Sequence, residues 1–149
     1  MNITRKTAYS LRALYEIVIT GKGSPINRKI ISERQKLSMH FLERLLKDLA
    51  NAGITRSIKG PGGGFVLNKP ADRITVWDVY CAVEDKSHFY NKCAFFNTKD
   101  CDLFLECQVK HIWPKINKAV KESMTDISLK DVCQKTIDQG EKNEKESRN

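Results

Sequence analysis

The sequence lacks the long apolar segments that mark membrane or exported proteins. No uninterrupted apolar run approaches the roughly 18 residues of a membrane-spanning helix. The N-terminus is basic, but Arg12 and Glu16 interrupt the apolar stretch that follows, which is wrong for a secretory signal. We therefore expect a cytoplasmic protein with no membrane partner. Its 149 residues, 40% of them hydrophobic, suit one ordinary domain or a small domain with an attached arm.

Signatures of catalysis and of common metal folds are also missing. No carboxylate pair or Ser/His/Asp set is evident, so we do not expect an enzyme. The five cysteines, at positions 81, 93, 101, 107 and 133, include no CxxC pair, which removes the commonest zinc-finger and thioredoxin patterns. An odd cysteine count without an export signal argues against a disulfide framework. It favours reduced thiols, a metal or redox chemistry.

Excess positive charge is confined to one half of the chain. The 26 Lys and Arg against 18 Asp and Glu give a net charge of +8. Residues 1–80 hold 14 basic and 6 acidic residues, whereas residues 81–149 hold 12 of each. This segregation indicates a polyanion partner for the N-terminal half, with a solvated basic face as the alternative.

The N-terminal half begins with three predicted helices. Apolar spacing predicts an amphipathic helix over residues 4–20, a short helix over 27–35 and a third over 38–52. Asn27 and Ser38 are good N-caps for the second and third. Because only a few residues separate these two, they predict a helix-turn-helix. The side chains expected to be buried in them are Ile30, Ile31, Leu42, Leu45, Leu46 and Leu49.

A short ribbon should follow the third helix. β-branched residues dominate 54–59, a second apolar run covers 65–67, and Gly60-Pro61-Gly62-Gly63-Gly64 lies between them, which predicts a hairpin with a glycine-rich tip. Phe65-Val66 follows the last glycine where a P-loop needs Lys-Ser or Lys-Thr, so nucleotide binding is not expected. A helix-turn-helix followed at once by a two-stranded ribbon is the element order of a winged helix.

The C-terminal half should be helical around one loop. Thr75 and Asp78 are typical of a capping pair for a helix through Val83. Residues 86–101 lack periodicity and predict a loop. Alternating spacings of four and three then predict a long helix suited to dimerisation, with irregularity near 110–114 caused by Pro114. A short helix should start near Ser128. The residues of the long helix's apolar seam are Leu105, Val109, Ile112, Ile116 and Ala119.

The predicted helix over residues 38–52 supplies the expected nucleic-acid contacts. Such a helix presents its exposed N-terminal side chains to base edges in the major groove. Arg44 can pair with guanine, and Glu43 can accept from cytosine or form a surface pair with Lys47. Phe41 can meet a thymine methyl group or lie in the core. His40 lies on the same exposed face.

The glycine-rich tip has two interpretations. Arg56 and Lys59 flank the turn, and a slim basic ribbon suits an A·T-rich minor groove. The alternative is that the glycines serve only to allow a tight turn.

The remaining chemistry lies in the cysteines. Cys93, Cys101 and Cys107 fall within fifteen residues, and clustered thiolates bind soft metals and iron–sulfur clusters. Their spacing does not fit a zinc knuckle. His111 lies four residues beyond Cys107, so on a helix both would face one side. Three unrelated thiols and a surface histidine are the alternative. The two cysteines expected in the core are Cys81 and Cys133.

Several of these segments together resemble one family. They are Ile31-Ser32-Glu33-Arg34-Gln35, Leu42-Glu43-Arg44-Leu45-Leu46, Ala52-Gly53-Ile54 and Gly60-Pro61-Gly62-Gly63-Gly64-Phe65. Over roughly residues 1–135 the chain is similar to the iron–sulfur cluster regulator (IscR) and nitric-oxide-sensing repressor (NsrR) family of dimeric bacterial winged-helix transcription factors. The resemblance implies a homodimer on a pseudo-palindromic operator in double-stranded DNA, with the long helix crossing its partner. The contacts that it implies with DNA are made by His40, Phe41, Glu43, Arg44 and Lys59.

The resemblance also implies a cofactor. In the cluster-binding branch three cysteines ligate an iron–sulfur cluster, and Cys93, Cys101 and Cys107 match them, although the first gap here is seven residues where the family usually has five. A histidine just after the third cysteine maps onto His111 with one residue of displacement and favours 2Fe–2S over 4Fe–4S. Ala8 stands where the nitric-oxide branch takes an aspartate from the partner, so that mode is not expected. Other candidates for the fourth ligand are Glu106, Asp102 and a partner-chain group.

These observations predict a mainly α fold with a small β-hairpin: a winged helix-turn-helix plus a long dimerisation helix. We expect a DNA-binding domain over 1–84, a cluster-ligand loop over 85–102, dimerisation and C-terminal helices over 103–138 and a disordered polar tail over 139–149.

The expected function is that of an iron–sulfur cluster-dependent transcriptional regulator, a repressor or activator that senses redox state, iron or cluster status, or nitric oxide. Two alternatives stay open. One is a metal-free regulator of the same fold controlled by a protein or small-molecule partner. The other is an iron–sulfur carrier protein without DNA binding.

Overall fold

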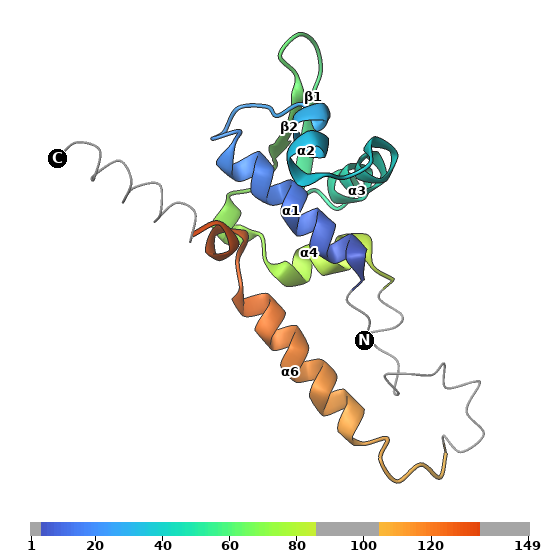
Figure 1. Ribbon diagram of the computed structural model, residues 1–149. Helices are drawn as coiled ribbons and strands as arrows, with labels where there is room; N and C mark the ends of the chain where they lie inside the picture. The colour runs from blue at the N-terminus through green and yellow to red at the C-terminus, as the bar shows by residue number, and fades with distance from the viewer. Residues whose placement is uncertain (1–3, 86–104, 135–149) are drawn as a thin grey trace, which may run out of the picture.

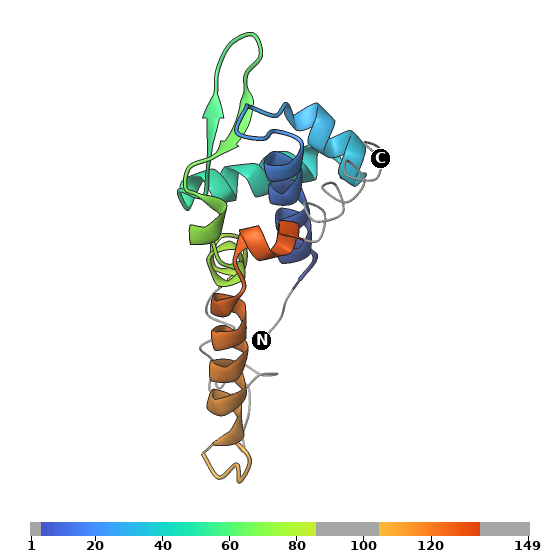
Figure 2. The same cartoon turned by 90° about the vertical axis from the view of Figure 1, so that its left-hand side faces the viewer.

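The computed structural model describes residues 4–85 and 105–134 as a helical head that carries a β-hairpin and from which one long helix projects (Figure 1). The hairpin and the N-terminal end of the long helix lie at opposite extremes of the molecule (Figure 2). The elements are α1 (Arg5–Ile19), α2 (Arg28–Gln35), α3 (Met39–Asn51), β1 (Thr55–Ile58), β2 (Gly64–Leu67), the 3-10 helix η1 (Ala71–Arg73), α4 (Val76–Val83) and α6 (Ile112–Asp126). The predicted mainly α fold with a small hairpin is confirmed.

Local caps fix where the first helices begin. The Thr4 side chain accepts from the amide of Lys6, and the Asn27 side chain accepts from that of Lys29. The Ser38 hydroxyl accepts from the amide of Phe41 at the start of α3. Each cap satisfies an amide that the first helical turn leaves without a partner. The two predicted N-caps of the helix-turn-helix are therefore confirmed.

The hairpin is a wing tied to the head by backbone hydrogen bonds. β1 and β2 pair antiparallel, from Thr55 opposite Leu67 to Ile58 opposite Gly64. Beyond the strands, Ile26 in the loop between α1 and α2 exchanges two backbone bonds with Phe65, with N···O distances of 3.0 and 2.8 Å. A Cβ atom on Gly64 would lie 2.2 Å from the Ile26 carbonyl oxygen, so this close approach requires glycine.

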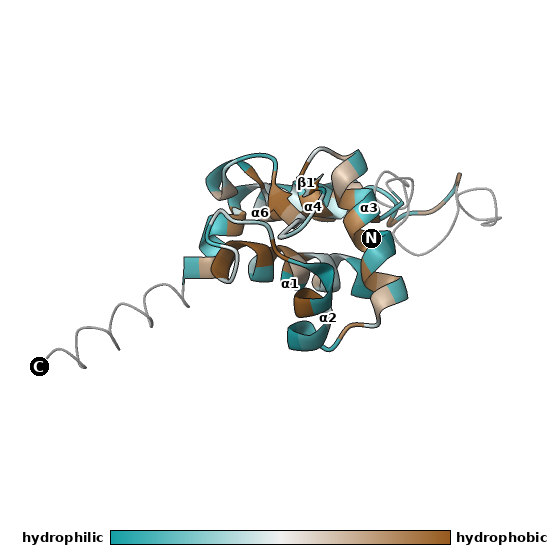
Figure 3. Cartoon of the chain, turned by 90° about the horizontal axis from the view of Figure 1, so that it is seen from above, coloured by the Kyte–Doolittle hydropathy of each residue, from teal (hydrophilic) through white to brown (hydrophobic). Residues whose placement is uncertain are grey.

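The core of the head lies where α1, α3 and α4 meet. The predicted leucine stripe of α3 is confirmed, because Leu42, Leu45, Leu46 and Leu49 are all buried. In α2, Ile31 is buried but Ile30 is 40% exposed, so the expected burial of Ile30 is wrong. Neighbouring positions on a helix point about 100° apart, and only Ile31 faces the core. The outer face of α2 is hydrophilic (Figure 3).

A capping box begins α4, as its sequence predicts. The Thr75 hydroxyl accepts from the Asp78 amide, and the Asp78 carboxylate accepts from the Thr75 amide. Trp77 and Tyr80 stack on this helix with ring centroids 5.3 Å apart. Val120 and Met124 of α6 pack beside these rings, so α4 is the surface on which α6 rests.

The long helix starts later than predicted. It begins at Ile112 rather than near residue 103, and residues 105–111 form turns. Pro114 therefore lies in the first turn, where its missing N–H leaves no hydrogen bond broken. The irregularity predicted near residues 110–114 is confirmed, but its form is a helix start rather than a kink. The loop predicted over 86–101 and the tail predicted over 139–149 lie outside the described residues.

The chain returns to the head after α6. The amide of Val76 donates to the Ile127 carbonyl at 2.9 Å, and the amide of Leu129 donates to the Ile74 carbonyl at 2.7 Å. Residues 129–134 are helical, and Leu129 and Cys133 are fully buried in the main core. The prediction that Cys133 packs in the core is confirmed, whereas Cys81 is only half-buried, beside Tyr80 and Met124. Within the described residues, every helix falls short of the length and apolar character that crossing a bilayer demands.

Candidate nucleic-acid interface

The recognition helix α3 presents a polar face opposite its leucine stripe. His40, Glu43, Arg44 and Lys47 are exposed on this face. Among the described residues, the side chains of Arg44 and Lys47 form no hydrogen bond or ion pair. Free cationic groups on an exposed helix suit contacts with base edges and phosphates. The structure thus brings four of the predicted DNA-contact residues onto one surface.

Glu43 is held from the neighbouring helix. The guanidinium of Arg28, at the start of α2, lies 2.9 Å from its carboxylate, and both side chains remain about half exposed. The surface pair considered between Glu43 and Lys47 is therefore replaced by a pair across the helix-turn-helix. Such an exposed pair adds at most about 1 kcal/mol to stability, so its main effect is to orient the Glu43 carboxylate.

Phe41 is half-buried rather than fully exposed. Its ring meets the edge of Tyr9 from α1 at 5.7 Å between centroids and packs against the main core. The guanidinium of Arg12 lies 5.2 Å from the centre of the Tyr9 ring. This arrangement favours the core role for Phe41 and fixes the start of α3 against α1.

A basic hollow adjoins the N-terminus of α3. Its lining residues include Arg5, Lys6 and Lys36 together with Tyr9 and Phe41, and its volume is about 590 Å³. No acidic side chain occurs among the described residues that line it. Sequence reasoning missed this hollow because residues 5–9 and 36–41 meet only in the fold. The available signal was the basic pair directly after the Thr4 cap.

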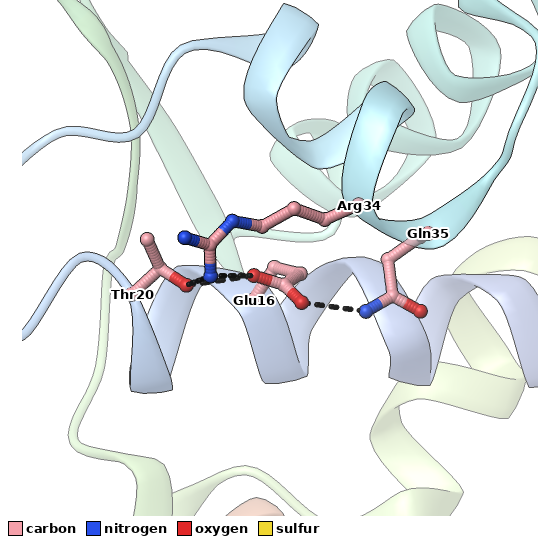
Figure 4. Close-up of polar contacts among 4 residues, drawn as sticks. All are labelled: Glu16, Thr20, Arg34 and Gln35. Atoms are coloured by element: carbon pink, nitrogen blue, oxygen red, sulfur yellow. Dashed lines mark hydrogen bonds and ion pairs between the residues drawn. The ribbon is translucent and has the colours of Figure 1, made fainter.

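The buried carboxylate of Glu16 fixes α2 against α1 (Figure 4). It accepts hydrogen bonds from the Thr20 hydroxyl at 2.7 Å and from the Gln35 side-chain amide at 2.6 Å. The Arg34 guanidinium lies 3.7 Å away and donates to Thr20 at 3.0 Å. Because these partners satisfy the buried charge, the C-terminal turn of α2, which leads into α3, has a defined position.

The two predicted wing cations occupy different places. Lys59 is exposed directly before the glycine-rich turn. Arg56 lies opposite Val66 in the hairpin, and residues opposite each other project from the same face of a sheet. Arg56 therefore lies over the face of the wing that carries the buried Val66, toward α1, at the base of the wing rather than its tip.

The predicted metal ligands are described only in part. Cys107 is half-buried and His111 is exposed, while Cys93 and Cys101 lie outside the described residues. Cys107 and His111 both belong to the turns before α6, so the helical face expected to join them does not form. Within residues 4–85 and 105–134, no group of three or more His, Cys, Asp or Glu side chains could hold a metal ion.

Comparison with known proteins agrees with this geometry. Residues 3–135 match the Rrf2 family, described as iron-dependent transcriptional regulators. The chain belongs to the Rrf2 family. Its members are transcriptional regulators rather than enzymes, so the expectation of a non-enzymatic, DNA-binding regulator is confirmed.

Relatives of this Rrf2 protein include regulators that are named for different roles. The HTH-type transcriptional regulator IscR of Vibrio atlanticus is 33% identical over 87% of this chain and 73% of its own length. The solved structure of T. potens IscR has a TM-score of 0.70 at 26% identity and covers 91% of this chain and 88% of that chain. The structure of CymR, the global cysteine regulator of B. subtilis, has a TM-score of 0.71 at 29% identity. The match covers 90% of this chain and 97% of the CymR chain. The resemblance to the IscR type of winged-helix regulator is thereby confirmed.

Proposed function

We propose that this Rrf2-family regulator acts as a homodimer that binds a pseudo-palindromic operator and whose affinity for it depends on an iron–sulfur cluster. The observation that carries the DNA-binding part is the exposed polar face of α3 beside a basic hollow. The proposed contacts do not include Arg56, because it lies at the base of the wing. They are made by His40, Glu43, Arg44, Lys47 and Lys59, while Phe41 packs against Tyr9 and positions the start of α3.

The exposed seam of α6 supports the homodimer. Ile112, Ile116 and, in the preceding turns, Leu105 and Val109 are exposed, with Leu105 at 83% and Ile116 at 41%. α6 packs on α4 through Val120 and Met124, toward its C-terminal end, whereas its N-terminal part projects from the head (Figure 2), so these apolar side chains are available to a second copy of the chain. Pairing of two such helices would set the separation of two recognition helices, which must match about 34 Å, one turn of DNA.

The donor set suits an iron–sulfur cluster. Three thiolates, from Cys93, Cys101 and Cys107, with the His111 imidazole, are the soft ligands that such clusters take. Cys107 and His111 lie at the N-terminal end of α6, next to the proposed dimer seam. When bound, the cluster would supply a centre that responds to oxidation and nitric oxide, with 2Fe–2S preferred over 4Fe–4S. These residues would then connect the state of that centre to the dimer helix.

A metal-free regulator is the second candidate. The fold similarity to CymR, described as a cysteine regulator, favours it as a specific alternative. In that case the same DNA surface would be controlled by another ligand or protein. We propose a cytoplasmic location for either candidate.

Anaerobic purification tests the cluster. Visible absorbance with bound iron and sulfide is expected in the wild-type protein and in Cys81→Ala, and its loss is expected in Cys101→Ala. If the wild-type protein is colourless and binds operator DNA with the same affinity as Cys101→Ala, the cluster proposal is overturned and the metal-free regulator is favoured. A coloured protein that ignores duplex DNA in every state would support the carrier alternative.

Titration with operator DNA tests the reading surface. Operators would first be selected from random duplexes by the purified protein. Because a good base contact contributes about 1–3 kcal/mol, Arg44→Ala should weaken binding by roughly 5- to 150-fold. The matched control Lys130→Ala, an exposed cation away from α3, should leave binding unchanged. Equal affinity for both variants would remove α3 as the reading helix.

A further inference from the structure

A second pocket lies at the base of the wing. It has a volume of about 430 Å³ and is bounded by the end of α1, the loop between α1 and α2, and the strands of the wing. Its floor is apolar, with Ile17 and Val66 buried beneath it. A volume in the range of 300–1,000 Å³ with an apolar floor is typical of sites for small molecules.

Three cations surround this floor. Lys22, Arg56 and Lys69 line the pocket, and their side chains are without ion pairs or hydrogen bonds in the part of the chain that the structure describes. None of the described residues lining the pocket is acidic. Since Arg56 projects from the same face of the hairpin as Val66, its guanidinium belongs to the pocket and not to the tip of the wing. The pocket therefore combines an apolar floor with an uncompensated positive rim.

The walls of the pocket are fixed without a ligand. The two backbone bonds between Ile26 and Phe65 hold the loop against β2. Lys22 adopts a left-handed φ of +47° and Gly23 one of +91°, which turn the loop back over the end of α1. On the other side, the Asn68 amide donates to the Ile54 carbonyl at 2.9 Å. Binding therefore needs little ordering of the chain, which reduces its entropic cost.

The position of the pocket separates it from the recognition helix. The basic hollow beside α3 uses the N-terminal end of α1, and this pocket uses the C-terminal end. With a rise of about 1.5 Å per residue, the two ends of α1 lie roughly 20 Å apart. Cations alone suffice for a DNA phosphate, whereas an apolar floor adds nothing to such a contact.

We propose that this pocket binds a small amphipathic organic anion, one with a carboxylate, sulfonate or phosphate group on an apolar body. The anionic group would lie among Lys22, Arg56 and Lys69, and the apolar body would cover Ile17 and Val66. The site is independent of any cluster and of DNA.

Octanoate and its uncharged counterpart 1-octanol test the proposal on the full chain. Backbone amide NMR shifts should change saturably with octanoate at residues 22–24, 56 and 66–71. 1-Octanol cannot make the charge contacts with the three cations. Because 1.4 kcal/mol corresponds to a tenfold change in Kd, 1-octanol should bind about tenfold or more weakly than octanoate. The combined variant Lys22→Gln, Arg56→Gln, Lys69→Gln should show a similar loss. The matched control Lys115→Gln, Lys118→Gln, Lys130→Gln should bind octanoate as the wild type does.

Several results would overturn the proposal. One is the absence of saturable shifts at these amides up to roughly 10 mM octanoate, a concentration that still reveals a millimolar Kd. Others are equal binding of octanoate and 1-octanol, and unchanged binding by the variant at the pocket. If bound operator DNA abolishes the octanoate shifts, the rim is a phosphate contact and the proposal is wrong. Persistence of the shifts on DNA supports it, and none of these results depends on the cluster.

Discussion

The carboxylate of Glu84 accepts a hydrogen bond from the Thr7 hydroxyl at 2.7 Å, although 77 residues separate them in the chain. The same oxygen also accepts from the Thr7 amide at 3.3 Å and from the Thr4 hydroxyl at 2.6 Å. Glu84 thus connects the end of α4 to the first turn of α1. Burial opposes its ionisation, but the hydrogen bonds from Thr4 and Thr7 outweigh burial and lower the pKa of the Glu84 carboxyl below its usual value.

Replacement of Glu84 should give a pH-dependent loss of stability. At pH 7, Glu84→Gln should lower the free energy of unfolding by about 1–2 kcal/mol, since hydrogen bonds to a charged acceptor are the stronger ones. A lowered folded pKa means that the contribution is fully present above the ordinary Glu value of about 4.3 and is lost as the pH falls through the folded pKa. Urea unfolding curves should therefore converge for the two proteins in acid. The exposed Glu122→Gln is the control, and a difference that persists unchanged at low pH would contradict the assignment.

Glu43→Gln should change the operator sequence that the protein prefers. It should have little effect on the free energy of unfolding. The change removes the charge attraction to Arg28 and replaces an acceptor-only carboxylate with an amide that can also donate, while an exposed pair contributes only about 0–1 kcal/mol to stability. Selection from random duplexes should yield a changed base preference at one position in each half-site. Glu33→Gln, which disrupts the surface pair with Lys29, should select the same operators as the wild type. Identical preferences for all three proteins would remove Glu43 from the reading surface.

Leu129→Ala should destabilise the head. Leu129 is fully buried in the same cluster as Leu14 and Leu42, and a Leu to Ala change in a core costs about 2–5 kcal/mol. Its neighbour Lys130 is exposed, so Lys130→Ala should change stability by no more than about 0.5 kcal/mol. Denaturant unfolding measures both. If Leu129→Ala lowered the free energy of unfolding by no more than Lys130→Ala does, the C-terminal helix would not belong to the core.

Ile116→Lys should dissociate the proposed homodimer without unfolding the head. The Ile116 side chain is 41% exposed, so a charge there costs little in a monomer. In a packed seam the same charge would be buried without a partner, which costs several kcal/mol. Sedimentation velocity should show a monomer for Ile116→Lys and a dimer for Lys115→Ala. A dimer in both would place the interface elsewhere.

Local sequence signals predicted the parts of this fold that depend on neighbouring residues. Asn27, Ser38 and the Thr75–Asp78 pair act within one helical turn, and the glycine-rich tip acts within one hairpin. The start of α6 was missed because Leu105 and Val109 continue the apolar spacing into turns, which spacing alone does not distinguish from a helix.

The parts of the candidate site that failed or were missed depend on tertiary contacts. Ile30 and Ile31 are equally apolar, and only the packed structure shows which one is buried. The face on which Arg56 lies follows from the strand register, which the sequence leaves open. The hollow at Lys6 and Lys36 exists only once α1 and α3 are packed together.

The buried helix at residues 129–134 also constrains how the protein is made. Its side chains complete a core whose other members precede residue 84, so a nascent chain must be synthesised almost to residue 133 before that core can close. Until then the emerging first half exposes the apolar faces of α1 and α3 on the ribosome, where chaperones can bind them. A fragment that ends at residue 84 would lack Leu129 and Cys133, so its core would stay incomplete.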